Sequence, residues 1–112
     1  MAVSRENISP ELIKDIKLDL GITWEDEATN AKIRGFIARG MVYLADKLGD
    51  SAEKPLDYIG DTQERTLLFE FVRYARDAAL DVFENNYMSL ILAAQHNRQV
   101  SKYVESAQQT EE

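Results

Sequence analysis

Residues 61–84 read DTQERTLLFEFVRYARDAALDVFE, and this stretch decides the fold class. Its apolar residues recur every three or four positions, which is the period of one face of an α-helix. The opening Asp61-Thr62-Gln63-Glu64 has the composition of a capping box, with both acidic groups at the favoured end of a helix. The stretch therefore predicts a long amphipathic helix. Its inward face is predicted to consist of Leu67, Leu68, Phe71, Val72, Ala75, Ala78, Ala79, Val82 and Phe83.

A second long helix is predicted over residues 24–48. Thr23 and Asp26 have the spacing of a capping box at its start. Two glycines lie inside this helix, where each costs roughly 1 kcal/mol relative to alanine. We expect Gly40 to let a neighbouring helix approach closely and Gly35 to be tolerated on the surface. The alternative for these glycines is a hinge.

Shorter segments surround these two helices. Ser9 and Pro10 have the composition of a helix start, and Gly21 is a plausible end for the same helix. Residues 50–60 contain a proline and end in glycine, so we expect a loop between the two long helices. Asparagine favours caps and turns, so Asn85-Asn86 is predicted to break the chain before a fourth helix.

These segments predict an all-α protein, a small bundle of about four helices with two long antiparallel helices at its centre and a polar C-terminal tail. The length of 112 residues suits one domain. We divide the chain into a flexible N-terminal arm at 1–8, a helical domain at 9–97 and a polar C-terminal extension at 98–112.

Composition excludes several classes of function. The chain has 20 acidic and 13 basic residues, a net charge of -7, and its basic residues are scattered, so we expect no sequence-specific nucleic-acid binding. It has no cysteine, which excludes disulfides and thiolate chemistry. The first seven residues lack the apolar core of a signal peptide, and the longest uncharged stretch, 85–97, is too short to cross a membrane.

Candidate chemical groups are sparse in the sequence. His96 is the only histidine and is expected to face solvent, so no His-based dyad or two-His metal site can form within one chain. Residues 25–27 (Glu-Asp-Glu), or Asp57 with Asp61, could bind a hard cation, but their spacing matches no calcium loop. We predict no catalytic residue, no metal or cofactor site, and no enzymatic activity.

Five aromatic residues are candidates for contacts with other subunits. Tryptophan and tyrosine are favoured where one side of a ring is apolar and the other is wet, as at subunit contacts. The sequence pattern places these five less securely in a core than the phenylalanines. The candidates are Trp24, Tyr43, Tyr58, Tyr87 and Tyr103.

Part of the sequence resembles a known family. The segments ELIKDIKLDLGI (11–22) and FIARGMVYL (36–44), with Asp26, Ile33 and Gly49 at their places between and after them, are similar to the head-tail connector proteins of tailed bacteriophages. The likeness covers about residues 11–95. It rests on patterns of residue type and not on a catalytic signature. Gly40 stands where that family commonly has alanine.

The resemblance implies a structural, non-enzymatic role at the head–tail junction of the virion, after synthesis in the host cytoplasm. Connectors of this kind form a ring, typically of about a dozen subunits, between the portal protein and the tail completion proteins. DNA passes through that ring. A net negative charge suits such a channel, since it suppresses phosphate contacts that would retain the duplex.

Two alternatives remain at this stage. A small helix-turn-helix regulator could use Ile22-Thr23 as its turn, but the following helix begins with acidic residues where a recognition helix should carry clustered Arg or Lys. A helical hydrolase that binds a divalent ion through carboxylates could use Glu70, Asp77 and Asp81 on one helix face, with Asp46 on the second helix.

Overall fold

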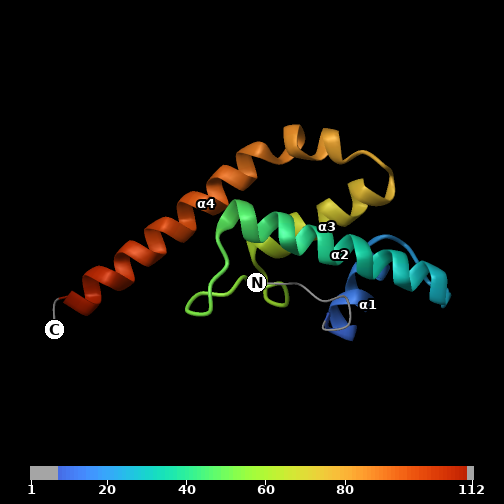
Figure 1. Cartoon of the computed structure of the whole chain (residues 1–112), viewed down its shortest axis with the longest axis horizontal. Helices are drawn as coiled ribbons and strands as arrows, with labels where there is room; N and C mark the ends of the chain where they lie inside the picture. Colours follow the sequence, from blue (N-terminus) through green and yellow to red (C-terminus); the bar gives the residue numbers. More distant parts are fainter. Residues whose placement is uncertain (1–7, 111–112) are drawn as a thin grey trace.

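A computed structural model describes residues 8–110 of the chain, with side chains up to residue 100. It contains four helices, α1 (Pro10–Asp19), α2 (Glu27–Leu48), α3 (Gln63–Arg76) and α4 (Leu80–Thr110) (Figure 1). This part of the chain holds no β-strand, so the predicted all-α fold is confirmed. None of its helices combines the length and the apolar character needed to span a membrane.

Helix α3 lies at the centre of the bundle. It packs against both α2 and α4, which also contact each other, and α1 contacts both α2 and α3. Figure 1 shows α3 running antiparallel to both α2 and α4, which confirms the predicted antiparallel central pair. Burial of apolar side chains from all four helices holds this arrangement together. The fully buried large side chains are Leu12, Ile16, Ile33, Ile37, Leu44, Leu67, Leu68, Val72, Phe83 and Ile91.

The two glycines inside α2 both face the protein interior. A Cβ on Gly40 would lie 2.7 Å from Leu68 Cδ1 and 2.9 Å from Phe71 Cδ1, closer than carbon atoms normally approach. Gly40 therefore permits the close approach of α2 and α3, as predicted. Gly35 is also buried, so its predicted place on the surface is wrong. The helix continues through both positions.

The start of α2 differs from the prediction. Asp26, and not Thr23, caps the helix: its carboxylate accepts hydrogen bonds from the backbone N–H of Thr29 at 3.0 Å and from the Thr29 hydroxyl at 2.7 Å. A carboxylate satisfies the free amides of the first turn and also interacts favourably with the positive end of the helix dipole. Helix α2 therefore begins at Glu27, and Trp24 lies in the turn before it.

Caps of the other helices follow the sequence more closely. Thr62 caps α3 by accepting a hydrogen bond from the Arg65 N–H at 3.1 Å, one residue later than a cap at Asp61 would require. Ser9 occupies the N-cap position of α1, but its side chain makes no capping hydrogen bond. Gly21 and Gly49 follow α1 and α2 with φ of 77°, a conformation that glycine adopts without strain.

The chain reverses direction at residues 77–79, inside the stretch that was predicted to be one helix. Ala78 has φ of 55°, and the Ala79 N–H donates to the Tyr74 carbonyl at 2.8 Å, as in a Schellman cap with alanine at the usual glycine position. The buried face of α3 therefore ends at Ala75. Ala78 and Val82, which were predicted to belong to it, are exposed. The predicted break at 85–86 is also wrong, because both asparagines lie within α4.

We expect Ala78→Gly to stabilise the protein by about 1 kcal/mol, because the left-handed conformation costs alanine roughly 1–2 kcal/mol more than glycine and part of this gain is lost to unfolded-state entropy. Urea denaturation followed by circular dichroism measures the change. Ala93→Gly, at an exposed position inside α4, is the matched control and should destabilise by about 1 kcal/mol. If Ala78→Gly destabilised the protein as much as Ala93→Gly, the backbone at Ala78 would not be strained.

Helix α4 continues past the predicted domain boundary at residues 97–98. Arg98 donates hydrogen bonds to the carbonyl oxygens of Leu48 at 3.1 Å and of Lys54 at 2.8 Å, and Gln95 donates to the Lys47 carbonyl at 2.8 Å. These bonds fasten α4 to the C-terminal end of α2, where a positive charge is favourable. Beyond them α4 extends away from the bundle to one end of the 54 Å long axis (Figure 1).

Candidate functional site

Two of the five aromatic interface candidates pack inside the chain. The ring of Tyr43 lies 5.4 Å from that of Phe71, and the ring of Tyr87 lies 5.3 Å from that of Phe83. Tyr74 joins the same group, with its ring 5.8 Å from Phe83. These five rings form an aromatic cluster between α2, α3 and α4, and such contacts stabilise beyond the area that they bury. Tyr43 and Tyr87 therefore serve the fold of the chain itself.

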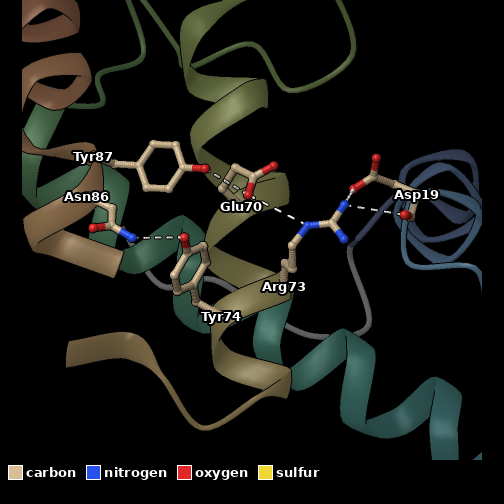
Figure 2. A network of polar contacts seen from close by, with 6 residues as sticks. All are labelled: Asp19, Glu70, Arg73, Tyr74, Asn86 and Tyr87. Carbon is tan, nitrogen blue, oxygen red and sulfur yellow. Dashed lines mark hydrogen bonds and ion pairs between the residues drawn. The ribbon is translucent and has the colours of Figure 1, made fainter. Parts of the chain in front are cut away.

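Polar atoms at the edge of this cluster join three helices (Figure 2). The Tyr87 hydroxyl donates to Glu70 Oε2 at 3.0 Å, and Arg73 Nε lies 3.6 Å from that same oxygen. Arg73 Nη2 reaches Asp19 Oδ2 at 2.6 Å, at the C-terminal end of α1. Asn86 donates to the Tyr74 hydroxyl at 3.1 Å. The network fixes the orientation of α1 and α4 against α3.

Burial changes the acidity of three tyrosines. It raises the pKa of Tyr87 to about 12, with a further contribution from the hydrogen bond and negative charge of Glu70. Burial also raises the pKa of Tyr43, helped by the negative charge of Glu84, and that of Tyr58, helped by Asp50. These tyrosines therefore stay neutral at physiological pH.

Tyr58 belongs to the loop between α2 and α3. Its hydroxyl is buried without a hydrogen-bond partner among the described residues, and its carbonyl accepts a bond from Arg65 at 2.8 Å. The neighbouring Asp57 accepts from the N–H groups of Ile59 and Gly60, which hold the pKa of the Asp57 carboxyl below its usual value. Asp57 thus stabilises a turn.

Among the candidates whose side chains are described, Trp24 is the exposed one, with 51% of its area accessible. It lines a groove of about 880 Å³ formed by α1 and the first turns of α2. The apolar part of the groove includes Ile13, Leu18 and Ile22. Trp24 therefore lies exposed beside an open apolar groove, and Tyr43 lines a second hollow between α2 and α4.

Lys17 and Glu25 line the same groove and neutralise each other. Lys17 is buried, and its Nζ lies 3.1 Å from Glu25 Oε1. Hydrogen bonds from Asn30 and Lys17, together with the positive charge of Lys17, hold the pKa of the Glu25 carboxyl below its usual value. This pair fixes the corner between α1 and α2.

The outer face of α4 is a candidate interaction surface that the five aromatic residues do not indicate. Two residues of this helix between 82 and 100 are charged, Glu84 and Arg98; both are half-buried and bond to the C-terminal end of α2, and the residues classed as exposed in this range are all uncharged. The large apolar side chains exposed there are Val82, Met88, Leu92 and Val100. A sequence signal was available, since residues 85–97 carry no charge in a chain where 29% of residues do. We call the exposed residues of 82–100 the neutral face of α4.

The remaining candidate residues, which are Tyr103, His96 and the acidic residues, do not form a site in the described part of the chain. The side chain of Tyr103 lies outside the described residues. His96 is exposed on α4. Glu70 lies in α3, whereas Asp77 follows its end and Asp81 belongs to α4, so the three carboxylates do not share one helix as the hydrolase alternative required. Among the side chains that the structure describes, residues 8–100, no group of three or more acidic or histidine residues could hold a metal ion.

The turn between α1 and α2 spans residues 20–26, where the regulator alternative placed its turn. Acidic residues 25–27 occupy the start of α2. Comparison with protein-family models, curated proteins and solved structures gives no match for this chain.

Proposed function

We propose that this protein is a structural head-tail connector of a tailed bacteriophage, whose subunits form a ring between the portal and the tail completion proteins. DNA passes through the ring. The neutral face of α4 is the observation that carries this proposal, together with the sequence resemblance over residues 11–95. The protein acts by fitting against neighbours and not by transforming a substrate.

Charge supports a role for this face in contacts between subunits. Copies that each carry a net charge of -7 repel one another. The neutral face lets two copies approach without placing like charges together. Burial of Met88, Leu92 and Val100 would then favour association by about 25 cal/mol for each Å² of apolar surface removed from water.

A closed ring requires that each subunit use two different surfaces. The neutral face of α4 supplies one of them. Val42, which is exposed on α2, borders a hollow of about 710 Å³ together with Leu80 and Glu84 of α4, and the groove at Trp24 lies on α1 and α2. The groove at Trp24 lies on elements other than α4, so the neutral face of one copy can contact the groove of the next in a head-to-tail ring.

We expect Leu92→Glu to prevent assembly, because it places a charge at the centre of the neutral face. Native mass spectrometry and electron microscopy at increasing protein concentration, with and without the portal and tail completion proteins, measure the assembly state. The wild-type chain should form rings under at least one of these conditions, and Leu92→Glu should remain monomeric while keeping its helical circular dichroism spectrum.

Ala52→Glu adds the same charge at an exposed position in the loop between α2 and α3, and it should assemble as the wild type does. A wild-type chain that stays monomeric even with both partner proteins present would refute the proposed function. Ring formation by Leu92→Glu at wild-type concentrations would show that the neutral face is not the contact.

A further inference from the structure

The groove at Trp24 has an apolar floor that the described chain leaves open. Leu18 at the end of α1 is 58% exposed and Trp24 is 51% exposed, and both line the groove. Ile13 and Ile22 beneath them are buried. Exposed apolar side chains gathered around a groove are typical of a site that binds another segment of protein.

The groove also carries positive charge that forms no ion pair with the side chains described for residues 8–100. Lys14 and Arg34 line it, and neither forms an ion pair with a described residue. Glu25 is the acidic residue of the groove, and Lys17 neutralises it. In a chain with a net charge of -7, two unbalanced cations beside an apolar floor favour an acidic, partly apolar segment as the occupant.

The C-terminal segment of the chain has this composition. Residues 100–112 read VSKYVESAQQTEE, with three glutamates against one lysine, a net charge of -2. Their apolar residues recur at helical spacing, as in segments that bind a groove through one helix face. These apolar residues are Val100, Tyr103, Val104 and Ala107.

Geometry prevents the segment from entering the groove of its own chain. Gln95 and Arg98 fasten α4 to the end of α2, and from there α4 runs away from the bundle as a continuous helix to Thr110. Figure 1 shows the far end of α4 at one end of the molecule and α1 in the opposite half. An occupant with this sequence must therefore come from another copy.

We propose that the groove formed by α1 and α2 binds the C-terminal segment, residues 100–112, of a second copy of this chain. The contact joins two different surfaces, so it can repeat from copy to copy. It closes into a ring when the rotation between neighbouring copies divides a full turn. In naming this contact we rely on the proposed ring of subunits.

Disulfide cross-linking tests the contact directly, because the natural chain has no cysteine. Two purified variants, Leu18→Cys and Val104→Cys, are mixed in equal amounts and oxidised under mild conditions. We expect a disulfide-linked dimer of the two variants on a non-reducing gel. Ile59→Cys is the matched control for Leu18→Cys, since Ile59 is 57% exposed but lies in the loop before α3, and its mixture with Val104→Cys should give little dimer.

Charge reversal separates a specific contact from a structural effect. Adding Arg34→Glu to the Leu18→Cys chain should lower the yield of linked dimer by about fivefold at low salt. Adding Glu105→Arg to the Val104→Cys chain should restore much of that yield. A structural defect in the groove would not be repaired by a change on the other chain.

Several outcomes would overturn the proposed contact. Equal yields with Leu18→Cys and Ile59→Cys would show random collision. A disulfide within single chains that carry both Val3→Cys and Leu18→Cys, without a Leu18–Val104 dimer, would identify the N-terminal residues as the occupant. If rings assembled but no Leu18–Val104 disulfide formed, the groove contact alone would be refuted. If the disulfide formed and Glu105→Arg restored its yield, but no rings assembled, the proposed function alone would be refuted.

Discussion

Phe83→Ala is expected to lower the free energy of unfolding by about 3–5 kcal/mol, the range for removing a buried phenylalanine. Phe83 is 1% exposed, and its ring contacts four other aromatic rings of the cluster. Its removal leaves a cavity where α2, α3 and α4 meet. Because a domain of this size is stable by about 5–15 kcal/mol, the variant would lose a large part of its stability. Guanidinium denaturation followed by circular dichroism measures the loss.

Val82→Ala is the control for this prediction. Val82 precedes Phe83 in α4 but is 43% exposed, so its truncation should change the free energy of unfolding by no more than about 0.5 kcal/mol. Similar losses for the two variants would mean that the reversal at residues 77–79 does not direct Phe83 into the core.

Gly40→Val is expected to destabilise the protein by about 2–3 kcal/mol through overpacking. The added side chain would meet Leu68 and Phe71 of α3, so α2 and α3 would have to separate or both side chains would have to leave their rotamers. Helix propensity alone predicts the opposite sign, a gain of a few tenths of a kcal/mol over glycine. Thermal and chemical denaturation therefore decide which effect is larger.

A double-mutant cycle with Leu68→Ala isolates the cause. Shortening Leu68 removes the atom that lies nearest to the added Cβ, so the double variant should lose less stability than the sum of the two single variants. Strict additivity would contradict a clash between α2 and α3. A stabilising effect of Gly40→Val would show that the helices do not approach closely at this point.

The hydrophobic period predicted the number of helices and most of the core, but it could not locate the reversal between α3 and α4. Leu67, Leu68 and Phe71 are buried as predicted, because one face of α3 turns toward the core throughout its length. Ala78 gave no local signal of a turn, since alanine is the strongest helix former and rarely adopts positive φ. Packing of Phe83 against the central helices decides the path there.

The candidate site was predicted only in part. The interface role of Trp24 stays a prediction: its ring is exposed at an open groove, whereas Tyr43 and Tyr87 pack against other rings of the chain. A single sequence does not distinguish these cases, because the amphipathic ring of tyrosine suits a core edge and a subunit contact equally. The Arg73–Asp19 pair joins residues more than fifty positions apart, and such pairs depend on the tertiary fold.

The attachment of α4 near its middle divides this helix into two parts with different constraints. The part before Arg98 is held by the core and by the end of α2, so its sequence must keep both contacts. The part beyond Arg98 extends from the bundle as a continuous helix to Thr110 (Figure 1). Changes of length or composition in that part would leave the bonds of Gln95 and Arg98 to the end of α2 in place, so the two parts of the helix can change independently of each other.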